Sequence, residues 1–142
     1  MNYDGTWVRS YKYQNTVNGP FVENVGSYKD ASPVFRWQHV ISTTLDMGAW
    51  KPSVAIRYKS GYVDQNTDLN DNVVRVKSYT LVDVGVAYTG VKNLTLNAGV
   101  RNLFNTRPPF TNQGTMFQQG YDPRYTDALM RSLFLRATYK FM

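Results

Sequence analysis

Apolar and polar residues alternate in the C-terminal part of the chain. From Ser132 to Phe141 the odd positions are apolar or aromatic, and the even positions are mostly polar or cationic. The segment from Leu94 to Arg101 alternates in the same way. A β-strand places successive side chains on opposite faces, so each segment predicts a strand with one apolar and one polar face. Parity alone leaves two environments open, because a soluble sheet packed on a core alternates just as a lipid-facing wall does.

Further alternating segments upstream predict an all-β chain, an antiparallel up-and-down meander of about six strands. These segments are Thr6–Gln14, Phe35–Met47, Pro52–Tyr62 and Lys77–Thr89. Arg9 shares a parity with aromatic residues, which leaves the register of the first segment open. Asn15–Pro33 and Val63–Val76 are rich in polar and turn-forming residues and predict loops. A helical turn is compatible with Asp127–Ser132.

The connections between the predicted strands alternate between long and short. Their lengths are about 20, 4, 14, 4 and 25 residues, as in bacterial outer-membrane barrels with long extracellular loops and short periplasmic turns. Strands of about 11 residues, rising roughly 3.3 Å per residue at a tilt near ~40°, cover about 28 Å, close to the hydrocarbon thickness of a bilayer. Tyr, Trp and Phe gather near strand ends, as in interfacial girdles. These regularities favour a membrane barrel over a soluble sandwich.

Composition excludes several kinds of chemistry. The chain has 142 residues, enough for one domain, with 15% aromatic and 18% charged residues. The lack of Cys excludes disulfides, Cys-ligated zinc and a thiol nucleophile, and the single His argues against His-based metal or triad chemistry. We therefore expect no catalytic residues, no cofactor and no metal. The net charge of +6 is spread along the chain, which favours solvated loops and a polar lumen over a nucleic-acid site.

No stretch of about 18 apolar residues occurs, so the sequence predicts no transmembrane helix. The first residues have neither a basic start nor an apolar run, so no signal peptide is predicted. An outer-membrane protein must be exported, and we therefore expect Met1 to be an internal start and the chain to be the tail of a longer protein.

The order of several short motifs resembles the C-terminal end of the TonB-dependent outer-membrane receptors. The C-terminal motifs are Asn102-Leu103-Phe104, Arg107-Pro108-Pro109-Phe110 and Gly120-Tyr121-Asp122-Pro123-Arg124-Tyr125, followed by the strand that ends at Phe141. The upstream motifs are Asp4-Gly5-Thr6, Phe35-Arg36-Trp37, Tyr58-Lys59-Ser60-Gly61-Tyr62 and Asn93-Leu94-Thr95-Leu96. The resemblance covers nearly all of the chain. Met130 stands where the family usually has Gly, and Met142 follows the usual final aromatic residue.

The resemblance implies a fold and a function. Residues 1–142 would form a partial C-terminal barrel domain, without plug or signal peptide, within a plugged transmembrane β-barrel of about 22 strands in a Gram-negative outer membrane. The whole protein would take up a scarce solute of the siderophore, cobalamin or oligosaccharide class. Six strands cannot close a barrel by themselves, because unpaired backbone groups in hydrocarbon cost several kcal/mol each.

The same resemblance implies several partners. They are the remainder of the barrel and its plug domain, an energy-transducing TonB-type complex acting through the plug, the barrel-assembly machinery and outer-membrane lipid, with no nucleic acid. Inward-facing cations would line the lumen and face either an anionic solute or, more ordinarily, acidic plug residues. These cations are Arg36, Arg57, Lys59, Arg101, Arg136 and Lys140.

Two groups of residues are candidates for function. The apolar parity of the last strand resembles the signal that the barrel-assembly machinery reads, although it also describes any lipid-facing strand. Its residues are Leu133, Leu135, Ala137, Tyr139 and Phe141. In the loop Asn105–Arg131, aromatic and Arg side chains suit contact with a ligand at the barrel mouth, although they suit packing of the loop equally well. These ligand-contact candidates are Arg107, Phe117, Tyr121, Arg124 and Tyr125.

Two other classes of protein remain open at this stage. A soluble lipocalin-like β-barrel would turn its apolar parity inward around a small apolar ligand. A nucleic-acid-binding protein with exposed aromatic residues and basic charge would bind single strands with strong salt dependence. The membrane assignment requires the reverse of the lipocalin-like arrangement, with apolar side chains outside and charged ones toward a hydrated interior.

Overall fold

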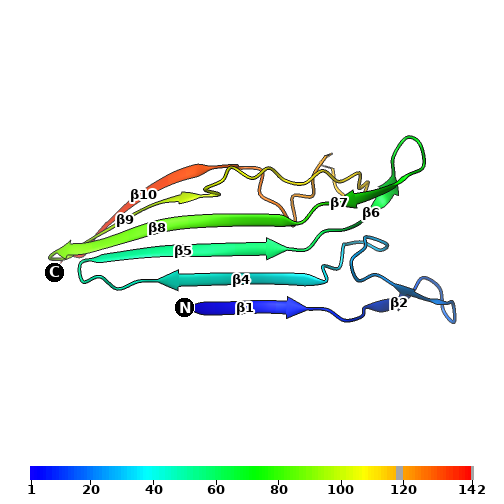
Figure 1. Cartoon of the computed structure of the whole chain (residues 1–142), viewed down its shortest axis with the longest axis horizontal. Helices are drawn as coiled ribbons and strands as arrows, with labels where there is room; N and C mark the ends of the chain where they lie inside the picture. The colour runs from blue at the N-terminus through cyan, green and yellow to red at the C-terminus, as the bar shows by residue number, and fades with distance from the viewer. Residues whose placement is uncertain (118–119, 142) are drawn as a thin grey trace.

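One antiparallel sheet forms the body of the molecule (Figure 1). The computed structural model describes residues 1–117 and 120–141. The six strands of the sheet follow the order β1-β4-β5-β8-β9-β10. They are β1 (Asn2–Trp7), β4 (Trp37–Thr44), β5 (Trp50–Lys59), β8 (Tyr79–Val91), β9 (Leu94–Arg101) and β10 (Ser132–Tyr139). Neighbours in this order pair antiparallel, which confirms the predicted all-β meander.

The remaining strands form small hairpins within the long connections. β2 (Lys12–Gln14) pairs with β3 (Phe21–Glu23), and β6 (Tyr62–Thr67) pairs with β7 (Val73–Val76). In Figure 1 all the long connections lie at one end of the sheet, and the short turns lie at the other end, where the chain also ends. The predicted sorting of long and short connections is therefore confirmed.

The pairing register places the apolar side chains of neighbouring strands on one face. Leu133 lies opposite Val100, Val100 opposite Val84, and Val84 opposite Val54. Residues directly opposite each other in an antiparallel sheet point to the same face, so this row crosses β10, β9, β8 and β5 on one side. The next row along the same face consists of Leu135, Ala98, Val86 and Pro52.

This apolar face does not close around a core. Leu133 and Leu135 are 81% and 79% exposed, and Val84 and Ile56 are only partly buried. The apolar side chains therefore form a broad surface on an open sheet and do not converge in a sealed interior. A soluble protein of this size would bury such a surface, whereas a lipid-facing wall leaves it exposed to acyl chains.

The buried hydrophobic cluster lies among the long connections instead. It contains Tyr28, Phe35, Tyr62 and Val76, and Tyr125 packs against it. Tyr28 and Phe35 come from the connection between β1 and β4, and Tyr62 and Val76 come from the β6–β7 hairpin. The cluster therefore joins three long connections into one packed body at the same end of the sheet.

The short turn between β4 and β5 shows how the sequence forms such connections. Gly48 has a φ of 69°, a left-handed conformation that glycine adopts without a steric penalty. Asp46 accepts a hydrogen bond from the Gly48 backbone N–H at 3.1 Å and forms an ion pair with Lys51 at 2.7 Å. Both local contacts favour a sharp reversal at this point in the chain.

The prediction of one strand over Thr6–Gln14 is wrong. β1 spans Asn2–Trp7, and β2 lies in a separate two-stranded sheet. If β1 continued past Trp7, Arg9 would lie on the apolar face, beside the Trp7–Trp37 pair. The sheet pairing ends before this guanidinium, which therefore stays out of the apolar surface.

The prediction of a polar loop over Val63–Val76 is also wrong, because this segment holds most of the β6–β7 hairpin. Asp68 closes its turn by accepting hydrogen bonds from the backbone N–H groups of Asn70 and Asn72, each at 2.8 Å. The polar residues that indicated a loop are therefore the residues that form the turn. β3 likewise lies within the loop predicted over Asn15–Pro33.

The helical turn considered over Asp127–Ser132 does not form, since no described residue is helical. Met130 adopts a left-handed φ of 62° there. The other strand ends differ from their predicted positions by a few residues. The two residues 118–119 of the predicted ligand loop and the unusual C-terminal Met142 lie outside the described residues.

Candidate functional site

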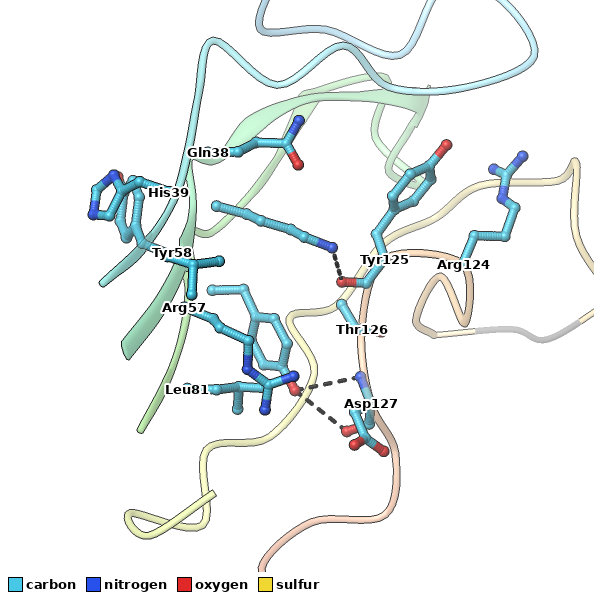
Figure 2. A pocket seen from close by; sticks show the side chains of 12 residues that line it. Gln38, His39, Arg57, Tyr58, Leu81, Arg124, Tyr125, Thr126 and Asp127 are labelled. Atoms are coloured by element: carbon cyan, nitrogen blue, oxygen red, sulfur yellow. Dashed lines mark hydrogen bonds between the residues drawn. The ribbon is translucent and has the colours of Figure 1, made fainter. Parts of the chain in front are cut away.

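A crevice separates the inner, polar face of the sheet from the loop between β9 and β10. It has a volume of about 300 Å³. β4, β5 and β8 form one wall, and the loop residues 124–127 form the other. In Figure 2 the labelled Gln38 and Arg57 extend from the strands toward the loop segment that carries Thr126 and Asp127. The loop therefore folds over the polar face, which makes that face the interior side of the sheet.

Arg124 fastens this loop to the connection between β1 and β4. Its guanidinium donates to both carboxylate oxygens of Asp122, Nε to Oδ1 at 3.0 Å and Nη2 to Oδ2 at 2.8 Å. It also donates to the backbone oxygen of Ala31 at 2.9 Å and to the Tyr28 hydroxyl at 2.5 Å. Hydrogen bonding to Asp122, which is 1% exposed, raises the pKa of Arg124 above its usual value. Arg124 therefore carries its charge throughout the accessible pH range.

Lys59, at the end of β5, fastens the same loop to the sheet. Its ammonium donates a hydrogen bond to the Tyr125 backbone oxygen at 2.7 Å. The ammonium nitrogen also lies 5.7 Å from the ring centroid of Phe35 and 5.5 Å from that of Tyr125. These two rings pack edge to face with centroids 5.3 Å apart. Cation–π attraction and the hydrogen bond together fix the position of the ammonium at the wall of the crevice.

Tyr79 holds the far end of the crevice. Its hydroxyl donates to the backbone oxygen of Asp127 at 3.3 Å and accepts from the backbone N–H of Asp127 at 3.4 Å. The Asp127 carboxylate accepts a further bond from the Leu129 backbone N–H at 2.8 Å. The position of Asp127 is thus set by contacts both to the sheet and within its own loop.

An ion pair beneath the crevice links two strands to the turn that follows β9. Arg57 donates to Asp83 across β5 and β8 at 2.7 Å. The other Asp83 oxygen accepts from the Asn102 backbone N–H at 2.9 Å. The Asn102 side chain in turn bonds both the backbone N–H and the backbone oxygen of Thr106. The Asn102-Leu103-Phe104 motif therefore starts the long loop from a fixed point on the sheet.

The β6–β7 hairpin supports the same loop from a third direction. The buried Asp64 carboxylate accepts hydrogen bonds from the Thr111 hydroxyl at 2.7 Å and from the Asn112 backbone N–H. Burial of the neighbouring Tyr62 raises the pKa of its hydroxyl, which stays protonated. Contacts from several separate chain segments therefore hold residues 111–112 and 124–125 of the loop against the rest of the molecule.

The structure separates the five ligand-contact candidates into two groups. Arg124 and Tyr125 both line the crevice. Tyr121 is half-buried outside that lining, Arg107 is exposed and Phe117 is 96% exposed on the loop surface. Ligand contact by any of these residues remains a prediction.

The sequence alone does not show that Arg124 and Tyr125 face β4, β5 and β8 across the crevice. Arg57 and Lys59 are expected on the inner face, as is Gln38 by its parity, but the sequence predicts no ligand contact by Gln38 or Asp127. The alternation along β4 carries a signal for Gln38, which shares the polar parity. Asp127 gives no such signal, because its position depends on the contact with Tyr79, 48 residues earlier in the chain.

The apolar residues of the last strand lie on one exposed edge of the sheet. β10 pairs only with β9 among the described strands. Its side chains Leu133, Leu135 and Tyr139, and Phe141 just after the strand, are between 53% and 88% exposed. Tyr139 and Phe141 contact each other edge to face, with ring centroids 5.0 Å apart. Whether this face acts as an assembly signal remains a prediction.

Residues 1–117 and 120–141 contain no group of three or more His, Cys, Asp or Glu side chains arranged to hold a metal ion. No helix that could span a membrane occurs among the same residues.

Comparison with known proteins identifies the family. The sequence model of the TonB-dependent receptor-like β-barrel matches residues 1–103. Among solved structures, a mutant of the ferric enterobactin receptor of Pseudomonas aeruginosa superposes with a TM-score of 0.55 and 21% identity, over 75% of this chain and 16% of that receptor. No curated protein matches the sequence. The chain spans a small part of that receptor's length. It belongs to the TonB-dependent receptors, as a segment of their outer-membrane β-barrel in Gram-negative bacteria.

Proposed function

We propose that this chain forms the C-terminal part of the barrel of an outer-membrane transporter that takes up a scarce solute with energy supplied through a TonB-type complex. The observation that carries the proposal is the register of the sheet. It gathers the apolar side chains on one open face and the charged ones on the other, where the long loop folds inward. The chain would supply barrel wall, extracellular loops and an assembly signal.

The two edges of the sheet support a larger barrel. β1 and β10 each pair on one side only among the described strands. Unpaired backbone groups at membrane depth cost several kcal/mol each, so these edges require further strands. We assign those strands to the remainder of a barrel of about 22 strands, with a plug domain inside. The plug would receive the pull of the energy-transducing complex.

The solute is assigned only by class. Siderophores, cobalamin and oligosaccharides are compatible with the proposal, and the ferric enterobactin receptor resembles this chain in fold. The loops around the crevice suit a fixed binding surface, because Arg124, Lys59 and Asp64 all bind the β9–β10 loop to its neighbours. Such a surface binds a solute without first ordering a flexible loop.

Membrane fractionation of the complete protein tests this proposal. The protein should fractionate with the outer membrane, require detergent for extraction, and support solute uptake that stops when the proton gradient is collapsed. A protein that stays soluble without detergent would contradict the proposal and favour the lipocalin-like alternative. If the protein inserts into the outer membrane but uptake continues without the proton gradient, energised transport is contradicted and the membrane location is not.

The assembly signal has a separate test. Replacing Tyr139 and Phe141 with Ser in the complete protein should reduce outer-membrane insertion, because the two exposed aromatic rings contact each other at the end of β10. The matched control is Thr138→Ser, on the opposite face of the same strand. Equal insertion of the double variant and the control would refute the signal.

A further inference from the structure

The crevice offers more hydrogen-bond donors than the protein uses. Among the described contacts, Arg57 donates one bond to Asp83, and Lys59 donates one bond to the Tyr125 carbonyl. A guanidinium has five N–H donors and an ammonium has three, so both groups retain donors beyond these bonds. Gln38 adds its side-chain amide to the same lining. In Figure 2, Gln38 and Arg57 both extend into the space between the sheet and the loop.

The charges around the crevice are only partly matched. Asp83 pairs with Arg57, and Asp122 pairs with Arg124. Lys59 has no carboxylate within 4.0 Å among the residues that the structure describes. Within the same part of the chain, no basic nitrogen lies within 4.0 Å of the Asp127 carboxylate. The lining thus contains one cation and one carboxylate that lack a direct ionic partner, on opposite walls.

Both of these groups are held in place before any ligand arrives. The ring contacts with Phe35 and Tyr125 restrict the Lys59 ammonium, and Tyr79 together with the Leu129 N–H fixes Asp127. A ligand that binds between them loses little free energy to ordering the side chains. The volume of about 300 Å³ lies at the lower end of the range for small-molecule sites.

The geometry points to a binding subsite for a small hydroxycarboxylate in this crevice. Its carboxylate would accept hydrogen bonds from Lys59, with the spare donors of Arg57 and Gln38 beside it. Its hydroxyl group would donate to Asp127 on the opposite wall. A ligand carboxylate without a neighbouring hydroxyl would make no hydrogen bond to Asp127, and the two negative charges would repel each other. This inference rests on the proposed function, because the solute enters from the side of the long loops.

Ligand-detected NMR on the complete protein in detergent tests the subsite, with L-malate and succinate as probes. The two dicarboxylates differ only by the hydroxyl group. L-Malate should bind about tenfold more tightly than succinate, since a hydrogen bond to a charged group is worth about 1.5–3 kcal/mol.

Lys59→Gln should weaken the affinity for both ligands about tenfold or more, while Lys59→Arg retains binding. Asp127→Ala, which removes the side-chain acceptor, should abolish the preference for malate. Lys51→Gln, at the opposite end of β5, is the matched charge control and should change neither affinity.

Several outcomes would overturn the inference. Equal affinity for malate and succinate would exclude the role of Asp127, and binding that survives Lys59→Gln would place the ligand elsewhere. A wild-type protein that binds neither probe would overturn the inference outright. Outer-membrane fractionation of the same samples separates this failure from failure of the proposed function, because insertion does not require the subsite.

Discussion

The ring of Phe134 covers Gly99, which lies directly opposite on the neighbouring strand. A Cβ atom at Gly99 would come within 2.6 Å of the ring carbons and within 2.5 Å of the Val84 backbone oxygen. Gly85 lies opposite Gly99 on the next strand, so the ring fills a depression left by two glycines on the inner face. Arg101 lies over the same ring at 5.7 Å. An aromatic residue at an inward position is therefore explained by the glycines beside it.

This contact predicts that Gly99→Ala destabilises the barrel by about 1–3 kcal/mol through overpacking. Movement of the Phe134 ring cannot relieve the clash with the Val84 backbone oxygen. Gly85→Ala is the matched control, because its Cβ would lie no closer than 3.3 Å to any neighbour. Unfolding of both variants in urea with lipid vesicles measures the difference. Equal destabilisation by the two substitutions would contradict overpacking at Gly99.

Met130 predicts a stabilising substitution. Its φ of 62° is left-handed, and the other non-glycine residues with positive φ are all Asn or Asp among the described residues. A left-handed backbone costs an ordinary L-residue roughly 1–2 kcal/mol, a penalty that glycine avoids. Met130→Gly should therefore be more stable than Met130→Ala by about 1 kcal/mol in the same unfolding assay. A Gly variant less stable than the Ala variant would show that this backbone is not strained.

Glu23 predicts a pH dependence in the first long connection. Its carboxylate accepts hydrogen bonds from the Ser10 hydroxyl, the Tyr11 N–H and the Val25 N–H, which lower its pKa to about 2 from 4.5. The folded pKa lies below the unfolded one. The stabilisation is therefore present above pH 4.5 and is lost as the pH falls toward 2.

Pepsin cleavage of this connection measures the effect, because pepsin is active throughout that window. Cleavage of the wild type should accelerate relative to Glu23→Gln as the pH falls from about 4.5 to about 2. Asp30→Asn, in the same connection, is the control and should follow the wild type. Parallel profiles for wild type and Glu23→Gln would remove Glu23 as the cause.

Asp122 predicts an opening of the β9–β10 loop. Asp122→Ala leaves the partly exposed Arg124 guanidinium without its ion-pair partner, and losing a hydrogen bond to a charged group typically costs about 1.5–3 kcal/mol. Backbone amides of residues 120–131 should lose protection from hydrogen exchange. Asp46→Ala is the matched control, because the exposed Asp46–Lys51 pair contributes about 0–1 kcal/mol. Unchanged protection in Asp122→Ala would mean that the contact between Lys59 and Tyr125 holds the loop without the ion pair between Asp122 and Arg124.

Sequence patterns predicted the sheet because the relevant signal is local. Alternation within a strand determines which side chains share a face, and the rows through Leu133, Val100 and Val84 follow from it once neighbouring strands pair. Strand ends were less predictable, as β1 showed by ending ahead of Arg9. A polar residue there marks the edge of the apolar surface without changing the alternation before it.

The crevice was not predictable in the same way. Its geometry depends on contacts between distant segments, such as Lys59 with Tyr125, 66 residues apart, and Asp64 with Thr111, 47 residues apart. Composition correctly indicated a polar inner wall, but it carries no information on where a loop of this length folds back. The sequence predicts ligand contact for Arg124 and does not indicate its ion pair with Asp122.

The direction of the apolar face is the central claim, and labelling of single cysteines in native membranes tests it most directly. The chain contains no Cys, so each introduced thiol is the only one that it contributes. The account predicts that Val84→Cys and Leu135→Cys react with a lipid-soluble maleimide and are protected from a membrane-impermeant one. Ala87→Cys and Thr138→Cys, on the opposite face, should react with the impermeant reagent. The reverse pattern, with Val84→Cys and Leu135→Cys labelled from water, would contradict the assignment to a membrane barrel.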